Sequence, residues 1–504
     1  MDTRVNHRVN PPGPLAAIDM GSNSFRLELG AMPQGQYRRA DYVKETVRLG
    51  AGLDANGMLT EDATQRGLAC LRRFSSRLSG FAPGQVRAVA TQTLREARNR
   101  NAFLLRAQEA LGFPIEVISG REEARLIYAG VNHLQPSADT RLVIDIGGRS
   151  TELILGQGRT PLVAESFGVG CVSLSMRFFE GGHITREAFR AAQVAAGAEL
   201  EEALQPFARS NWTQALGSSG TAGAVSQLLQ ANGVTDGSIT PEALRWCIER
   251  CLEAGHIDHI NLPGLKADRR AVLPGGLAIL YTLCTHFDIS SLMPAKGALR
   301  QGVIVDLHDR LQALQTAEPV DIRDQSVHEL QQRFRVDTAH AARVTSVALA
   351  LFDAGVPDAE AETRRELVWA CALHEMGQMV SHHDHHRHSA YLLAHVDAAG
   401  FSQSQQRRVA DLVLGQRGGL RKVEPQMASE TFAWQMLCLR LAVIKCHARG
   451  LVDPKALVLR ARQREAQLGF GKNWAETHPR TLFLLQEEVL TWARSGPLRL
   501  SLPT

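Results

Sequence analysis

Residues 15–30, LAAIDMGSNSFRLELG, decide the fold that this chain is expected to adopt. A short apolar run ends at Asp19, and a turn of small polar residues leads into a second strand with alternating apolar positions. Residues 142–156, LVIDIGGRSTELILG, repeat this order, with Asp145 at the end of the first apolar run. The repetition indicates a duplicated α/β unit, in which each copy opens with a hairpin.

The tip of each hairpin suits a phosphate chain and a cation. Glycines let backbone N–H groups approach an anion, and Ser and Thr hydroxyls add donors. A carboxylate at a strand end is a ligand that Mg²⁺ prefers. One such tip alone is ordinary hairpin chemistry, but two copies in register predict a cleft in which Asp145 and Asp19 hold Mg²⁺, with Mn²⁺ as the alternative. The predicted phosphate-binding residues of the tips are Ser22, Asn23, Ser24, Gly147, Gly148, Arg149, Ser150 and Thr151.

A third loop of small residues follows an apolar pair and precedes a helical pattern. A loop of this kind at a helix N-terminus is an anion site, although an ordinary strand-to-helix turn explains it equally well. Its predicted phosphate-binding residues are Gly217, Ser218, Ser219, Gly220 and Thr221. Further along, Lys266, Arg269 and Arg270 are candidates for contacts along a phosphate chain.

Composition limits the class of protein. A length of 504 residues predicts three or four domains. With 44% hydrophobic and 21% charged residues, the chain is neither disordered, collagen-like nor embedded in a membrane, although peripheral association with a membrane stays open. Eight cysteines without a C-x-x-C pair fit the reducing cytoplasm. Residues 405–504 carry 16 Lys and Arg against 8 Asp and Glu, which indicates either a polyanion-binding surface or a solvated helical one.

Together, these motifs resemble the exopolyphosphatase and guanosine pentaphosphate phosphatase family. The resemblance rests on DMGSNSF, TQTLREA (91–97), SGREEARLIYAGV (119–131), DIGGRSTEL, GSSGT (217–221), LPGGLAIL (273–280) and GALRQGVIVDL (297–307). It implies an α/β fold of duplicated actin-like (ribonuclease H-like) domains with a cleft between them, followed by a mostly α-helical region. We expect a flexible tail over 1–14, actin-like domains over 15–135 and 136–310, a helical domain over 311–425 and a basic domain over 426–504.

Two adjacent glutamates receive different roles. Ser119 and Glu122 have the spacing of a capping box, which gives Glu122 a structural task. Glu123 is left free to deprotonate a water molecule, and the resemblance implies the same residue as the catalytic base. Local sequence alone favours a solvated surface residue at this position. Glu152 is the second catalytic candidate, as a group that orients water or metal, and Arg95 is expected to bind a phosphate.

Position 149 departs from the family's pattern, which reads DIGGGST where this chain has DIGGRST. If the backbone there requires positive φ, Arg149 costs on the order of 1 kcal/mol. Alternatively, its guanidinium adds a contact to phosphate. Either effect predicts altered substrate handling and not an inactive enzyme.

The helical second half contains a cluster of histidines at 374, 382, 383, 385, 386, 388 and 395. This region resembles a histidine–aspartate (HD) phosphohydrolase domain, in which His340 and His374 match the first two histidines. The dyad's aspartate is Glu375 here, the later aspartate has no counterpart, and Gln416 replaces a further histidine. We therefore expect a structural domain that has lost its metal chemistry.

The sequence thus predicts a cytoplasmic, homodimeric exopolyphosphatase that removes terminal orthophosphate from inorganic polyphosphate. The alternatives are hydrolysis of guanosine pentaphosphate to the tetraphosphate, a sugar-kinase-like ATPase, and a sensor that binds without turnover. No nucleic acid is expected as a partner. The sequence leaves open the preferred chain length and any need for a monovalent cation.

Overall fold

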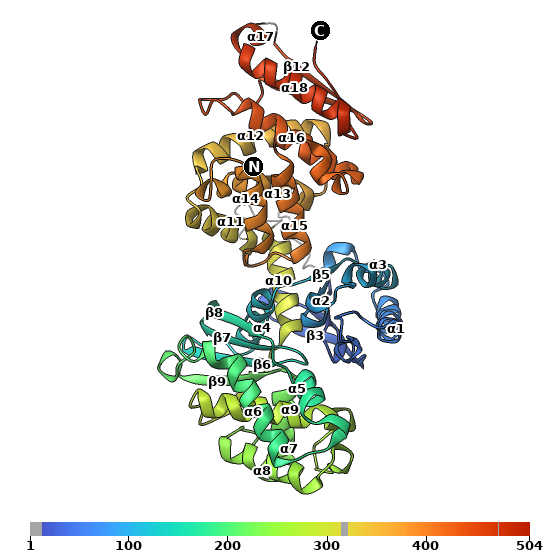
Figure 1. Cartoon of the computed structure of the whole chain (residues 1–504), viewed down its shortest axis with the longest axis vertical. Coiled ribbons are helices and arrows are strands. Elements are labelled where there is room, and N and C mark those ends of the chain that lie inside the picture. The colour runs from blue at the N-terminus through green and yellow to red at the C-terminus, as the bar shows by residue number, and fades with distance from the viewer. Residues whose placement is uncertain (1–12, 314–320, 472, 504) are drawn as a thin grey trace, which may run out of the picture. The chain divides into compact units, whose positions relative to one another are not determined.

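The computed structural model of the chain describes residues 13–313, 321–471 and 473–503 (Figure 1). Packing divides these residues into two compact units, one before and one after residues 314–320. Each unit has a hydrophobic interior of its own, so each is described by itself.

The first unit opens with a five-stranded sheet in the order β3-β2-β1-β4-β5. Strands β1, β2 and β3 are antiparallel neighbours, whereas β4 and β5 run parallel to β1. The bounds of these strands are β1 Leu15–Met20, β2 Ser24–Ala31, β3 Arg38–Thr46, β4 Val86–Ala90 and β5 Ile115–Val117.

A second sheet repeats this topology in the order β8-β7-β6-β9-β10, again with an antiparallel hairpin first and two parallel strands after it. Its strands are β6 Thr140–Ile146, β7 Thr151–Gln157, β8 Thr160–Phe167, β9 Gln214–Ser218 and β10 Leu292–Pro294. The predicted duplication is therefore confirmed, and the two sheets form the halves of an actin-like fold.

Strand register places equivalent residues at the two hairpins. Asp19 in β1 lies opposite Arg26 in β2, which in turn lies opposite Lys44 in β3. In the second half, Asp145 in β6 lies opposite Glu152 in β7. Because paired residues point to the same face of a sheet, each aspartate shares its face with its cross-strand partner.

Helices cover the outer face of each sheet and fill the space between the two. Around the first sheet, α1 and α3 close one core, and α5 to α9 close another around the second. Helices α4 and α10 lie between the sheets, in a core that takes residues from both (Figure 1). The bounds are α1 Glu61–Arg77, α2 Gln92–Glu96, α3 Arg100–Leu111, α4 Gly120–Leu134, α5 Cys171–Phe178, α6 Arg186–Leu200, α7 Ser219–Ala231, α8 Pro241–Ala254, α9 Leu273–His286 and α10 Leu299–Ala313.

Glycines allow α4 and α10 to cross with their backbones in contact. A Cβ atom added to Gly302 would lie 1.7 Å from the carbonyl oxygen of Leu126, and one on Gly130 would lie 2.4 Å from that of Ala298. Both distances are far shorter than any van der Waals contact, so a side chain does not fit at either position. Since α4 begins beside the cleft, this crossing fixes the helix that carries Glu122 and Glu123.

The second unit is mostly helical and ends in a small sheet, which the sequence analysis did not predict. One core runs from Val327 to Leu500, so the predicted boundary between residues 425 and 426 does not coincide with a break in packing. Its elements are α11 Ile322–Arg333, α12 Thr338–Gly355, α13 Ala361–Leu373, α14 His385–His395, α15 Gln403–Gly415, α16 Glu430–Lys445, β11 Leu457–Arg462, β12 Glu465–Phe470, α17 Trp474–Thr477, α18 Pro479–Ser495 and β13 Arg499–Ser501. Within the described ranges, no helix is both long and apolar enough to cross a bilayer.

Candidate active site

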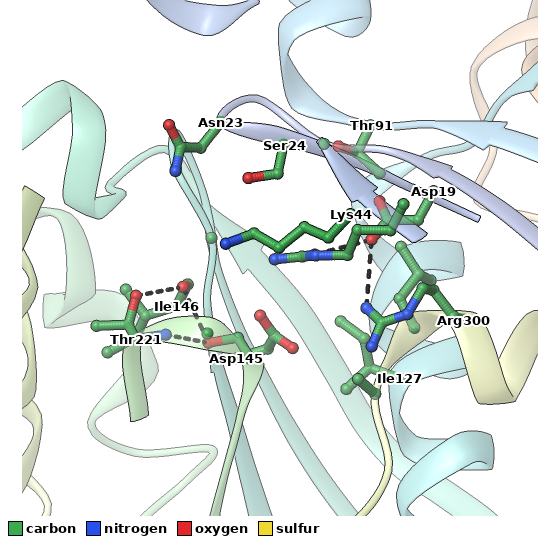
Figure 2. A pocket seen from close by; sticks show the side chains of 18 of the residues that line it. Asp19, Asn23, Ser24, Lys44, Thr91, Ile127, Asp145, Ile146, Thr221 and Arg300 are labelled. Atoms are coloured by element: carbon green, nitrogen blue, oxygen red, sulfur yellow. Dashed lines mark hydrogen bonds and ion pairs between the residues drawn. The ribbon is translucent and has the colours of Figure 1, made fainter. Parts of the chain in front are cut away.

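A polar cleft of about 290 Å³ lies between the halves of the first unit. Figure 2 shows Asp19, Ser24 and Thr91 of the first half on one side, with Asp145 and Thr221 of the second half on the other. The cleft is lined by most of the residues predicted to bind phosphate or metal, namely Asp19, Ser22, Asn23, Ser24, Asp145, Gly147, Gly148, Ser150, Ser219, Gly220, Thr221 and Arg269. The sequence motifs therefore converge on one site.

The two hairpin tips touch each other at the edge of this cleft. A Cβ atom on Gly148 would lie 3.0 Å from the Cβ of Ser22, so glycine permits the close approach. The Gly50 amide donates to the carbonyl of Ser22 at 2.8 Å and ties a further loop to the first tip. Arg149 has no positive φ, so the backbone strain considered for this position is wrong.

The third loop is anchored to the end of β6. The hydroxyls of Ser219 and Thr221 each donate to the Ile146 carbonyl at 3.0 Å (Figure 2 shows the Thr221 bond). Ser219 has a φ of 79°, a left-handed conformation that is unusual for a residue with a side chain. Helix α7 begins directly here, as the strand–loop–helix pattern predicted, and its N-terminus faces the cleft.

Four buried carboxyl groups gather in and beside the cleft, those of Asp19, Glu123, Asp145 and Glu152. The pKa of Glu123 is raised to about 7, chiefly by burial; Arg95 opposes the rise, and the charges of Asp19 and Asp145 add to it. Burial also raises the pKa of Asp145 to about 6. The pKa of Glu152 lies well above its ordinary value because the group is buried and faces the charges of Glu123 and Asp145. Such a cluster gains stability from a cation or from protons.

The adjacent residues Glu122 and Glu123 have different surroundings. The amide of Glu122 donates to the Ser119 hydroxyl at 3.1 Å, which caps α4 as expected. The Glu122 carboxylate accepts two bonds from Arg125, at 2.7 and 2.8 Å, and that arginine also pairs with Asp306 of α10. Glu122 is thus held in a buried ion-pair network, whereas Glu123 takes no part in that network and lines the cleft.

Arg95 does not line the cleft. Its Nη1 donates to Glu123 at 2.9 Å and to the Ile118 carbonyl at 3.0 Å, and its other nitrogens donate to Gln92. The predicted contact of Arg95 with phosphate stays a prediction. In the structure, Arg95 forms a hydrogen bond with Glu123, the candidate base.

Positive side chains that the sequence analysis missed also line the cleft: Arg26, Arg39, Lys44, Lys296 and Arg300. The position of Arg26 could have been predicted from the sequence, because Arg26 lies two residues after Ser24 in β2 and so faces the same side of the sheet. The position of Lys44 could not have been predicted, because it depends on how β3 pairs with β2. Figure 2 shows Lys44 reaching between Ser24 and Asp145, and its Nζ lies 3.1 Å from Asp268.

Several predicted residues lie outside the set of lining residues. Lys266 is exposed, and neither it nor Arg270 lines the cleft, so only Arg269 of that basic trio does. Glu152 is fully buried and accepts a hydrogen bond from Ser166 at 2.8 Å. The remaining residues outside the set are Arg149, Thr151, Gly217 and Ser218.

The histidine-rich region of the second unit brings three possible ligands together. The ligand atoms of His340, His374 and Glu375 lie within 4.8 Å of one another. However, Arg449 already donates to the Glu375 carboxylate at 2.6 Å and supplies the positive charge there. Burial lowers the pKa of His374 to about 4, and the neutral ring is also the form that binds a metal. The expected loss of metal chemistry in this group therefore stays a prediction.

Replacing His374 and Glu375 together with alanine is expected to preserve the hydrolysis that the sequence predicts. Turnover should stay within about twofold of the unchanged protein, because the residues predicted to react lie in the first unit. Removing buried His374 should still lower the stability of the second unit by about 2–4 kcal/mol. Calorimetry and phosphate release on the same sample measure both. Loss of hydrolysis in a protein that remains folded would point to a second catalytic site.

Two sheets of one topology on either side of a polar cleft define a protein of the actin-like fold. The chain belongs to the Ppx/GppA phosphatase family, whose family model matches residues 41–311. A second model, for Ppx/GppA phosphatase domain III, matches residues 322–489.

Solved structures agree with this assignment. The Aquifex aeolicus PPX-GPPA enzyme is 25% identical, with a TM-score of 0.50 over 58% of this chain and 98% of that one. An exopolyphosphatase from Cytophaga hutchinsonii is 23% identical, with a TM-score of 0.54 over 59% of this chain and 98% of that one, and shows a similar fold.

Proposed function

We propose that this protein is an exopolyphosphatase that releases terminal orthophosphate from inorganic polyphosphate by attack of water, and does so processively. The observation that carries the proposal is the charge of the cleft. Six basic residues line it against three carboxylates, so it suits a substrate with many negative charges. Membership of a phosphatase family supports hydrolysis as the reaction.

In the proposed reaction, the backbone N–H groups of the glycine–serine loops hold the terminal phosphate. Glu123 accepts the proton of the attacking water. Its pKa of about 7 suits this role, because a general base works best when its pKa is near the pH of the reaction. Arg26, Lys44 and Arg300 offset the charge that spreads over the phosphate oxygens and the departing chain.

The acidic side of the cleft fits a hard cation. Asp145 and Asp19 offer carboxylate oxygens, the donors that Mg²⁺ and Mn²⁺ prefer. Arg26 pairs with Oδ2 of Asp19 at 2.9 Å, so a bound ion would share that carboxylate with the arginine. We propose that the two aspartates hold Mg²⁺, with Glu152 orienting either the ion's water ligands or the attacking water. When bound, the ion would polarise the phosphate and lower the cost of its negative charge.

The cleft offers little to bind a guanine ring, which favours polyphosphate over guanosine pentaphosphate as the substrate. Tyr42 is the one aromatic residue among the described lining residues. The guanidinium groups of Arg39 and Arg300 lie 5.4 and 5.1 Å from the centre of its ring. A guanine ring would have to displace them to stack there, whereas a phosphate chain would gain from both charges.

Phosphate release from long-chain polyphosphate and from guanosine pentaphosphate, assayed side by side with and without Mg²⁺, tests the proposal. A larger kcat/KM on polyphosphate is expected, with Glu123→Gln as the inactive control. A larger value on the nucleotide would reverse the assignment. Hydrolysis of neither substrate would overturn it.

Mg²⁺ is expected to stabilise the protein more at pH 8 than at pH 5. The raised pKa values of Glu123 and Asp145 contribute stability that is present below the ordinary range near pH 4 and is lost as pH rises toward 7. At pH 8 the ion would relieve the repulsion of ionised carboxylates, whereas at pH 5 it must displace protons. Melting curves with Mg²⁺ or EDTA measure the effect, which Asp145→Asn should abolish. Equal shifts at both pH values would contradict the proposed ligands.

Long polyphosphate is expected to bind with steeper salt dependence than short chains. The hairpin of β11 and β12 exposes Arg460, Arg462 and Arg464, whereas Arg440 is buried against Glu488 and unavailable. Replacing the three exposed arginines with alanine should weaken long-chain binding about fivefold, since three contacts of about 0.3 kcal/mol add to roughly 1 kcal/mol. Binding to the inactive Glu123→Gln protein over a salt series measures this. Unchanged long-chain affinity in this variant, or equal salt dependence for long and short chains, would indicate that this surface plays no part in holding the chain.

A further inference from the structure

Arg149 takes the place of a glycine in the family's loop pattern, and its side chain crosses from one half of the first unit to the other. Its Nε donates to Glu96 of α2 at 2.8 Å, and its Nη1 donates to the Gly50 carbonyl at 3.2 Å. Arg149 belongs to the tip between β6 and β7 in the second half, whereas both partners belong to the first. The arginine therefore links the two halves directly.

From Glu96, hydrogen bonds continue without a gap to the candidate base. The amide nitrogen of Gln92 donates to Glu96 at 2.6 Å, and the amide oxygen of Gln92 accepts from Arg95 at 2.6 and 2.9 Å. The far end of the Arg95 guanidinium donates to Glu123 at 2.9 Å. Each group is used by its neighbours on both sides, so displacing one member loosens the hold on the next.

We propose that Arg149 is a positioning residue that fixes Arg95, and through it Glu123, by way of the relay Arg149–Glu96–Gln92–Arg95–Glu123. The inference rests on the proposed role of Glu123 as the base. It assigns to Arg149 a task in the reaction other than the phosphate contact expected from the sequence. Because the relay begins in one half and the base lies in the other, it makes the basicity of Glu123 depend on how the halves are joined.

The charges around Glu123 give the direction of the effect. Arg95 approaches it from α2, Asp19 from β1, Asp145 from β6 and Glu152 from β7. Of these four, Arg95 alone favours the ionised form. An Arg95 that is held less firmly leaves three carboxylates acting against ionisation, so more of Glu123 is protonated at a given pH.

Replacing Arg149 with alanine is expected to move the acidic limb of the pH dependence of kcat to higher pH by about 0.5–1 unit. This is part of the 1–3 units by which a nearby arginine lowers the pKa of a carboxylate. At pH 7, kcat should fall about twofold to fivefold, which follows from that shift through the fraction of ionised base when the starting pKa is about 7. KM should change little, because Arg149 is absent from the lining of the cleft. Arg149→Lys, which keeps a charge near Glu96, should restore part of the loss.

Gln92→Leu separates the relay from a simple ion pair between the halves. It leaves Arg149 and Glu96 paired but removes the link to Arg95. If the relay operates, Gln92→Leu shifts the profile as Arg149→Ala does, and the double variant is no worse than either single one. Arg121→Ala is the matched control. Arg121 lies on the same helix as Glu123, and its replacement breaks an exposed ion pair with Glu165 of β8. This variant should leave the pH profile unchanged.

A direct titration makes the test independent of substrate. In protein labelled at the glutamate carboxyl carbons, the Glu123 resonance is assigned by its disappearance in Glu123→Gln, and its midpoint is compared between the unchanged protein and Arg149→Ala. An upward shift in the variant supports the relay. Identical midpoints, or additive effects of Arg149→Ala and Gln92→Leu, would overturn it. An unchanged protein that hydrolyses neither substrate would refute the proposed function, while this titration would still decide the relay.

Discussion

Glu123→Gln is expected to lower turnover by about 10²-fold or more, within the range that loss of a general base produces. Glutamine keeps the shape of the side chain and can still accept from Arg95, but it cannot take a proton from water. Substrate affinity should be nearly unchanged. Single-turnover phosphate release, with substrate binding measured separately, distinguishes a slower chemical step from weaker binding.

The neighbouring glutamate is the control, and its expected effect is the opposite. Glu122→Gln removes a charge from the ion-pair network with Arg87, Arg125 and Asp306, where both arginines are largely buried. Leaving buried arginines with less opposing charge should lower stability by about 1–3 kcal/mol. Most turnover should remain in the folded protein. Were Glu122→Gln to abolish turnover and Glu123→Gln to leave it intact, the roles of the two residues would be reversed.

Gly302→Ala is expected to destabilise the first unit severely. A methyl group there would overlap the Leu126 carbonyl oxygen, and neither backbone can move without separating α4 from α10. Overpacking usually costs about 1–3 kcal/mol, and backbone overlap should place this variant at or above the upper end. The melting temperature of the first unit should fall by about 6–12 °C, at roughly 2–4 °C per kcal/mol.

Gly223→Ala is the matched control for that variant. It makes the same substitution inside a helix, but a Cβ atom on Gly223 would meet no atom within 4 Å, and the residue does not have positive φ. Alanine in a helix is favoured over glycine by about 0.5–1 kcal/mol, so this variant should melt at the same temperature or slightly higher. A Gly302→Ala protein that melts like the control would show that the two helices tolerate a wider separation.

The duplicated hairpins could be predicted from sequence because their signal is local. An apolar run, an aspartate and a small polar tip are contiguous, and the resemblance placed them in one fold. The choice of Glu123 as the candidate base depended on the capping pattern, which accounts for Glu122, and on the family resemblance. The positions of Lys44 and Arg300 in the cleft could not be predicted in this way, because they depend on the pairing of β3 and on the return of α10 to the first sheet.

Arg149 could be recognised as unusual from the sequence, but its partners could not be predicted. The departure from the glycine pattern was visible in the sequence, but the two explanations considered were strain and a phosphate contact. The third, a partner in the opposite half, required knowing that Glu96 and the Gly50 carbonyl lie beside the loop. Local sequence shows that a residue is unusual, whereas its partner is determined by tertiary structure.

The cross-strand partners of the two aspartates have a consequence for how this enzyme could have evolved. Asp19 and Asp145 occupy equivalent positions, yet the first lies opposite Arg26 and the second opposite Glu152. One hairpin of the duplicated unit has thus kept a basic residue beside its aspartate, whereas the other has kept a second acid. Under the proposed function, changes near Arg26 would alter which polyanions bind, and changes near Glu152 would alter how fast they are hydrolysed. Selection could therefore adjust binding and turnover through different hairpins.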